Sequence, residues 1–222
     1  MTCSVKLVSI STPVIEGANL SPEEFIAYTA RVSNPGNQMN TETAPKLLKY
    51  LLENKHYSPF EMVDFVVEIT TSMAIGEQIL RHSSAKFQKF SMRYAKANAF
   101  ITYPARRQDT KNRQNSIDDL PQDVKDWFMK SQQEVWDLAF TRYTQAIQQG
   151  IAKEQARFFL PMNTQTTLYM KMNVRDWLFY LLLRSGNGTQ KEHMDIANAI
   201  IQEVMIPKFP VVSEVVGWSS AR

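Results

Sequence analysis

The chain has 222 residues, of which 44% are hydrophobic, and a formal net charge of +3 at pH 7. This length and composition predict one hydrophobic core and a single domain over residues 1–222, and the single cysteine, Cys3, excludes an internal disulfide or a cysteine-rich metal site. The modest charge argues against a genome-binding domain, but it fits an enzyme whose substrates carry phosphate or carboxylate groups.

The beginning of the chain lacks the charged leader and apolar segment of a signal peptide, and no apolar run approaches the length that spans a bilayer. We therefore expect a soluble, cytoplasmic protein with no membrane partner and no metal. Cys3 lies near the N-terminus without a neighbouring base or cation cluster, so we do not expect it to act as a nucleophile.

The first half of the sequence predicts alternating strands and helices. Ser21–Glu24 has the pattern of a capping box with proline at the first helical position, and Leu47, Leu48, Leu51 and Leu52 form an apolar helical stripe. The expected elements are a strand over 5–11, helices over 22–32 and from 44, a strand over 62–70 and a helix from 73.

The second half predicts a longer helix and a second strand and helix pair. Residues 106–116 are polar and lack periodicity, so we expect an exposed, mobile segment there. Gly150 is a stop signal for the helix before it, and Asn173 is a good N-cap. The expected elements are strands over 100–103 and 164–172 and helices over 122–149, 174–184 and 190–205, the last ending near Pro207.

The run Arg81–Tyr94 combines cations, a histidine and several hydroxyl groups, and it follows the end of a predicted helix. We interpret it as a polar loop that binds phosphate and nucleotide, because Phe87, Phe90 and Tyr94 alternate with the cations as in a partly buried pocket. The alternative is a solvated basic face or a patch that binds nucleic acid.

Four segments in the same order resemble the motifs of the flavin-dependent thymidylate synthase family. The segments are Arg81-His82-Ser83 with Ser91-Met92-Arg93-Tyr94, His56-Tyr57-Ser58-Pro59-Phe60-Glu61, Ala156-Arg157-Phe158-Phe159-Leu160-Pro161, and Arg184 to Glu192 with Gln190. The sequence departs from the family pattern at Ser83, where arginine is usual, and at Thr189, where alanine is usual. Lys86, Gln88 and Lys89 replace the usual serine, asparagine and glutamate.

The resemblance implies an α/β fold with a central, mostly antiparallel sheet flanked by helices. It also implies a homotetramer with active sites shared between subunits. The implied reaction converts dUMP to dTMP, with methylenetetrahydrofolate as one-carbon donor and FAD, reduced by NADPH, as hydride source. No protein nucleophile is implied, and no nucleic acid partner.

The resemblance also assigns residues to ligands. The FAD-binding residues would be His56, Ser58, Arg81, His82, Ser83, Asn173 and Arg175. The residues that bind dUMP would be Gln78, Arg81, Lys89, Ser91, Arg93, Arg157 and Arg184. Arg184 would be catalytic, because a fixed cation beside the pyrimidine stabilises negative charge that develops on it.

Three alternatives remain open from the sequence. The altered motif motivates a related flavin and folate enzyme that modifies C5 of another pyrimidine nucleotide, for example by hydroxymethylation. A nucleic-acid-binding protein would use the basic run but would leave the His56 and Arg157 segments unexplained. The third alternative is an inactive nucleotide-binding homologue.

Overall fold

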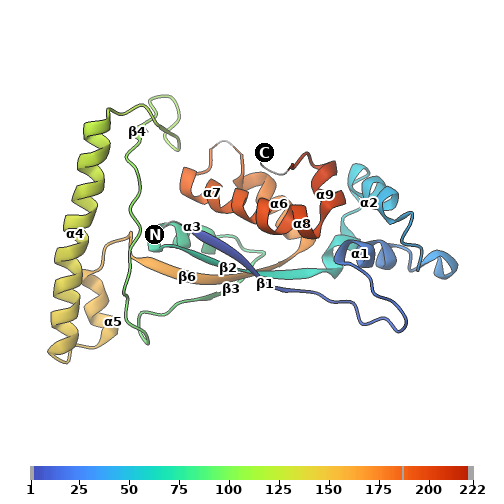
Figure 1. The fold of residues 1–222 in the computed structure, drawn as a ribbon, viewed down its shortest axis with the longest axis horizontal. Coiled ribbons are helices and arrows are strands. Elements are labelled where there is room, and N and C mark those ends of the chain that lie inside the picture. The colour runs from blue at the N-terminus through green and yellow to red at the C-terminus, as the bar shows by residue number, and fades with distance from the viewer. Residues whose placement is uncertain (1–2, 187, 220–222) are drawn as a thin grey trace.

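The computed structural model describes residues 3–186 and 188–219, and its centre is an antiparallel sheet of four strands in the order β1-β2-β6-β3 (Figure 1). The strands are β1 (Ser4–Ile10), β2 (Asp64–Ser72), β6 (Gln165–Asn173) and β3 (Lys86–Lys89). β2 and β6 pair along their whole length, from Asp64 opposite Asn173 to Ser72 opposite Gln165. The expected antiparallel sheet with flanking helices is therefore confirmed.

Helices cover one face of the sheet and both of its ends (Figure 1). The α-helices are α1 (Pro22–Ala30), α2 (Ala44–Glu53), α3 (Met73–Leu80), α4 (Gln122–Gln148), α5 (Lys153–Ala156), α6 (Val174–Arg184), α7 (Lys191–Ile200), α8 (Ile206–Lys208) and α9 (Pro210–Val215). The other helical turns are η1 (Pro35–Asn37), η2 (Ser58–Met62), η3 (Arg157–Phe159) and η4 (Ile201–Met205), of which η4 is a π-helix. Helices α6 to α9 lie over the sheet, with α1 and α2 beyond one end and α4 beyond the other.

Side chains at the helix starts set where the helices begin. Ser21 and Glu24 form the expected capping box, and Ser72 caps α3 by accepting from the Ile75 N–H. Asn173 Oδ1 accepts from the Asp176 N–H at 2.9 Å, which confirms it as the N-cap of α6. Both α3 and α6 thus begin directly where a long central strand ends.

The main core lies between the sheet and helices α6 to α9. Phe65, Val67 and Ile69 alternate along β2 and are fully buried, and Trp177 of α6 stacks on Phe65 at a ring centroid distance of 4.7 Å. A Cβ atom at Gly76 would lie 3.2 Å from Thr166 Cγ2, so glycine lets α3 pack tightly on β6. This packing fixes α3, which carries Gln78 at its C-terminal end.

Four expectations were wrong or incomplete. Residues 100–103 form no strand, since Phe100 makes only an isolated bridge to Thr164. The 106–116 segment is not irregular throughout, because β4 (Arg107–Gln108) pairs with β5 (Ser116–Ile117). The loop expected after Arg81 contains β3, and the last helix breaks at Phe209 rather than at Pro207. In the described ranges, no helix combines the length and apolarity needed to cross a membrane.

Candidate active site

Some of the predicted flavin residues gather where β6 ends. Arg175, in the first turn of α6, forms an ion pair with Glu61 of the His56–Glu61 motif, and its guanidinium carbon lies 5.8 Å from the Phe179 ring centroid. Arg175 Nε is buried and has no hydrogen-bond partner among the described residues. The structure therefore brings the Asn173–Arg175 segment beside the His56–Glu61 motif.

Three helix ends meet around the Tyr180 ring. His82 follows the C-terminus of α3 and contacts Tyr180 edge to face, with ring centroids 4.9 Å apart. Tyr180 Oη lies 2.8 Å from Nε2 of His193, in the first turn of α7, and both side chains are buried. Arg184, one turn after Tyr180 on α6, has a buried Nε without a partner in the described residues.

Burial and the Arg184 charge determine protonation in this group. Burial and then the charges of Arg184 and His82 lower the pKa of His193 to about 4, so its ring is neutral near pH 7. Burial and Arg184 also lower the pKa of His82, although Asp176 raises it. Burial raises the pKa of Tyr180, which therefore keeps its proton, and its hydroxyl shares a hydrogen bond with His193 Nε2.

Several predicted nucleotide residues lie toward the other end of β6, in and after β3. Lys89 forms an ion pair with Glu77 of α3, and Arg93 Nε contacts Glu154 Oε2 at 2.9 Å. Arg157 Nε donates to the Glu154 backbone oxygen at 3.1 Å. Arg157 forms no ion pair with an acidic side chain among the described residues, and its charge faces a backbone carbonyl and the Phe158 ring.

The predicted residues do not form one closed pocket in a single chain. Asn173 and Arg184 lie at opposite ends of α6, about 16 Å apart for a helix of this length. His56, Ser58, Arg81, Ser83 and Arg93 are exposed, whereas Ser91 is half-buried. Asn187, within the Arg184 to Glu192 motif, lies outside the described residues. The chain thus presents separate groups of site residues on its surface.

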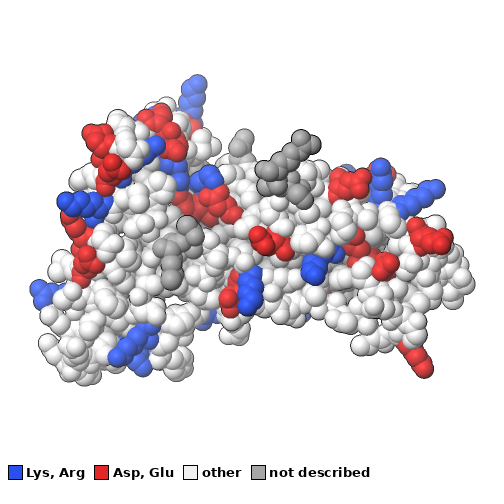
Figure 2. Space-filling model, in the orientation of Figure 1, with Lys and Arg blue, Asp and Glu red and all other residues white. Residues whose placement is uncertain are grey.

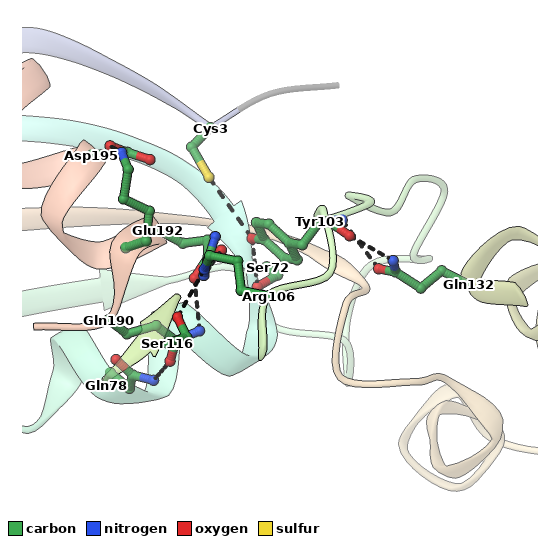
Figure 3. Close-up of polar contacts among 11 residues, drawn as sticks. Cys3, Ser72, Gln78, Tyr103, Arg106, Ser116, Gln132, Gln190, Glu192 and Asp195 are labelled. Carbon is green, nitrogen blue, oxygen red and sulfur yellow. Dashed lines mark hydrogen bonds and ion pairs between the residues drawn. The ribbon is translucent and has the colours of Figure 1, made fainter. Parts of the chain in front are cut away.

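A cavity of about 560 Å³ lies between the 101–106 segment, the β4-β5 hairpin and the start of α7. It is lined by Cys3, Tyr103, Arg106, Gln190 and Glu192 among others, and by none of the predicted site residues (Figure 3). Burial raises the pKa of Tyr103 to about 12, and its hydroxyl bonds Ser72. Cys3 Sγ lies 3.4 Å from the Thr71 hydroxyl.

Sequence reasoning missed the connection between this cavity and Gln78. Gln78 bonds Gln190, Gln190 bonds Glu192, and Glu192 bonds Arg106 (Figure 3). Arg106 was expected in a solvated segment, but its side chain is only 14% exposed because it is paired with Glu192. Gln190 and Glu192 belong to a recognised motif, so the motif contained the signal, although it could not identify their partners.

Charged side chains of both signs are interspersed on the face shown in Figure 2. Several basic residues are locally paired, for example Arg107 with Asp119 and Lys171 with Asp64. On this face the structure shows no continuous basic strip of the kind that tracks a nucleic acid backbone.

Comparison with known proteins gives concordant results. The family model described as thymidylate synthase complementing protein matches residues 16–211. A probable flavin-dependent thymidylate synthase of Paramecium bursaria Chlorella virus 1 is 48% identical over 97% of this chain and 99% of its own length. A flavin-dependent thymidylate synthase of Synechocystis sp. is 49% identical over 96% of this chain and 99% of its own.

A solved structure supports the fold independently. A UMP/dUMP methylase from Streptomyces cacaoi, bound with 5-Br dUMP, superposes with a TM-score of 0.82 over 97% of this chain and 95% of its own. The two sequences are 23% identical, so this likeness concerns the fold.

Proposed function

Because the chain belongs to the flavin-dependent thymidylate synthase family, we propose that it methylates dUMP with methylenetetrahydrofolate as one-carbon donor and FAD, reduced by NADPH, as hydride source. For this chain, the proposal rests most directly on the environment of Arg184. Its Nε is buried beside two histidines of lowered pKa and has no anionic partner in the described structure. A cation in such a place is stabilised by a bound anion.

The residues at the end of β6 fit a flavin dinucleotide. Arg175 has a buried, unpartnered Nε, and Asn173 and His82 add further polar groups close to the same sheet end. A guanidinium suits phosphate oxygens, since its planar donors match their geometry. Further contacts are proposed from His56, Ser58, Arg81 and Ser83, which are accessible. When bound, reduced flavin supplies the hydride that completes the methyl group.

The nucleotide is proposed to meet cations and polar donors from two regions. Arg93 and Arg157 are free to exchange their present contacts with Glu154 for a phosphate group. The proposed dUMP-binding residues are Gln78, Arg81, Lys89, Ser91, Arg93, Arg157 and Arg184. Arg184 would stabilise negative charge that develops on the pyrimidine ring during transfer of the one-carbon unit.

The protein part of the reaction is binding, orientation and electrostatic stabilisation. Cys3 is engaged with the hydroxyls of Thr71 and Tyr103 and is not assigned an attack on the ring. Alignment of the two substrates lowers the entropic part of the barrier.

We expect the active sites to need more than one subunit, because the proposed ligands lie in separate surface groups of one chain. The proposed assembly is a homotetramer.

Two measurements test the function. An absorbance spectrum of the purified protein should show flavin bands, and incubation with dUMP, methylenetetrahydrofolate and NADPH should yield dTMP. A hydroxymethylated product, or turnover of a deoxycytidine nucleotide alone, would replace this proposal by the related-enzyme alternative. Flavin binding without any turnover would favour an inactive homologue.

A further inference from the structure

The imidazole of His82 packs against the ring of Tyr180. The His82 backbone is fixed at the C-terminus of α3, because its N–H donates to the Ile79 carbonyl at 3.1 Å and its carbonyl accepts from the Ala85 N–H at 3.2 Å. Its ring makes no hydrogen bond within residues 3–186 and 188–219, and it contacts Tyr180 at an interplanar angle of 66°. The position of the His82 ring therefore depends on the position of Tyr180.

Tyr180 is itself held at its hydroxyl and at its ring. Its Oη lies 2.8 Å from Nε2 of His193, and its ring meets Trp177 of the same helix at a centroid distance of 5.7 Å. His193 is 1% exposed, and its N–H donates to the Gln190 carbonyl at 3.0 Å in the first turn of α7. The hydroxyl bond thus ties α6 to α7, and the contact with His82 ties α6 to α3.

The Tyr180–His193 pair adds no charge to this group. Tyr180 keeps its proton because burial raises its pKa, and burial with the charges of Arg184 and His82 lowers the pKa of His193, whose ring is neutral near pH 7. The charged groups that face His82 are Arg184 and Asp176, one helical turn after and before Tyr180 on α6. A fully satisfied, neutral hydrogen bond between buried side chains orients them rigidly.

We propose that Tyr180 and His193 are positioning residues, whose hydrogen bond fixes the Tyr180 ring and through it the imidazole of His82. The inference rests on the proposed function, in which His82 contacts FAD. A ligand binds more tightly to a side chain that is already oriented, because less side-chain freedom is lost on binding. Tyr180 and His193 are buried, so they act on the flavin through His82 and not by contact.

The test uses the full chain in three variants, Tyr180→Phe, His193→Leu and the double variant. NMR of histidine-labelled protein without flavin follows the titration of His82, which can be assigned because the sequence has three histidines. A flavin titration gives the Kd of FAD. The control is Tyr103→Phe, which removes a tyrosine hydroxyl that donates to Ser72 at 2.9 Å and is not part of the His82 group.

We expect Tyr180→Phe and His193→Leu each to move the His82 titration midpoint up toward its ordinary value near 6.5, because the loosened ring is less buried. Each should raise the Kd of FAD by at least about fivefold, the equivalent of one lost hydrogen bond. The double variant should bind FAD no more weakly than either single variant, because both changes break the same bond. Tyr103→Phe should match the parent in both measurements.

The inference is overturned if the folded single variants keep the parental His82 titration or the parental Kd, if their effects multiply in the double variant, or if the control changes as much. It is also overturned if the parent binds no FAD. A parent that binds FAD and shows these effects in the variants, yet makes no thymidylate, supports the positioning role and contradicts the proposed function.

Discussion

Arg184 combines a permanent charge with a buried Nε that has no partner in the described part of the chain. The side chain is half-buried, and a partly desolvated guanidinium is stabilised when a ligand or another subunit supplies a countercharge. Its neighbours His82 and Tyr180 do not supply it, because histidine is never an anion and Tyr180 keeps its proton. The side chain is therefore better explained by binding than by stability.

Replacement of Arg184 by alanine should abolish thymidylate formation and leave the fold intact. Loss of a charged partner of a bound anion costs about 2–5 kcal/mol, so nucleotide affinity should fall by at least about 30-fold. Nucleotide titration, turnover and thermal unfolding measure the three effects. The control is Arg142→Ala, which removes an exposed arginine of α4 whose one hydrogen-bond partner among residues 3–186 and 188–219 is Gln145. If the Arg184→Ala variant kept the parental turnover, Arg184 would not be a catalytic residue.

His193 should make stability depend on pH below neutrality. Its folded pKa is about 4 and its unfolded value is about 6.5, so the unfolded chain binds more protons between these limits. Stability from this group is complete above pH 6.5 and is lost as the pH falls toward 4, by roughly 3 kcal/mol in total. Arg184, His82 and Tyr180 are the charged or titratable groups that face it.

The measurement is urea unfolding from pH 7.5 to 4 in the parent and in the double variant Tyr180→Phe with His193→Leu. The difference between the two curves isolates the histidine, since the other titrating groups are shared. A difference that does not change across this range would show that His193 does not stay neutral in the fold.

Lys89 stands where the family has glutamate, and the structure pairs it with Glu77. We still expect it to contact a phosphate, because Glu77 is 54% exposed and can release it to a stronger anion. Lys89→Glu should weaken nucleotide binding, reduce its salt dependence and retain methylation of dUMP. Titrations at two salt concentrations measure this, with Glu77→Gln as control. If nucleotide binding by Lys89→Glu had the parental salt dependence, Lys89 would not contact a phosphate and would pair with Glu77 alone.

At the scale of elements, the predictions failed where the sequence signal for a strand was short or misleading. The strand expected over residues 100–103 was inferred from apolar residues, but Phe100 stacks on Trp136 and pairs only through its isolated bridge to Thr164. β3 escaped notice because Lys86–Lys89 is short and charged and pairs only with β6. The long strands and the capped helices were predicted correctly, since their signals are local.

The Arg106–Glu192 pair should hold the β4-β5 hairpin and the 101–106 segment against α7. Its side chains are 14% and 7% exposed, so Arg106→Met leaves a buried carboxylate unpaired and should cost about 3–5 kcal/mol, or roughly 10 °C in Tm. The adjacent Arg107→Met breaks the exposed pair with Asp119 and should leave Tm nearly unchanged. Equal Tm values for the two variants would contradict the anchoring role.

At the scale of the whole molecule, the sequence could not show how the site is assembled. The motifs identified most candidate residues, but their separation along the chain contained no information on which of them share a pocket. Contacts such as Gln78 with Gln190, which are 112 residues apart, depend on the packing of α3 against α7. Only the fold shows that two groups of candidate residues lie at opposite ends of α6.

Flavin binding and assembly should occur together. We expect gel filtration to give a tetramer and flavin titration to saturate, because the separate surface groups would form complete sites only between subunits. Dilution to monomers should release flavin, with light scattering and flavin fluorescence as readouts. Tight flavin binding by a monomer would contradict the shared site.

The pairing of β2 with β6 has a consequence during translation. Their registers join residues about 100 positions apart, so a growing chain on the ribosome holds β2, with Phe65, Val67 and Ile69, long before β6 exists to cover one of its edges. An edge of this kind invites pairing with other nascent chains. The unfinished sheet therefore presents this edge to other chains until β6 has been synthesised.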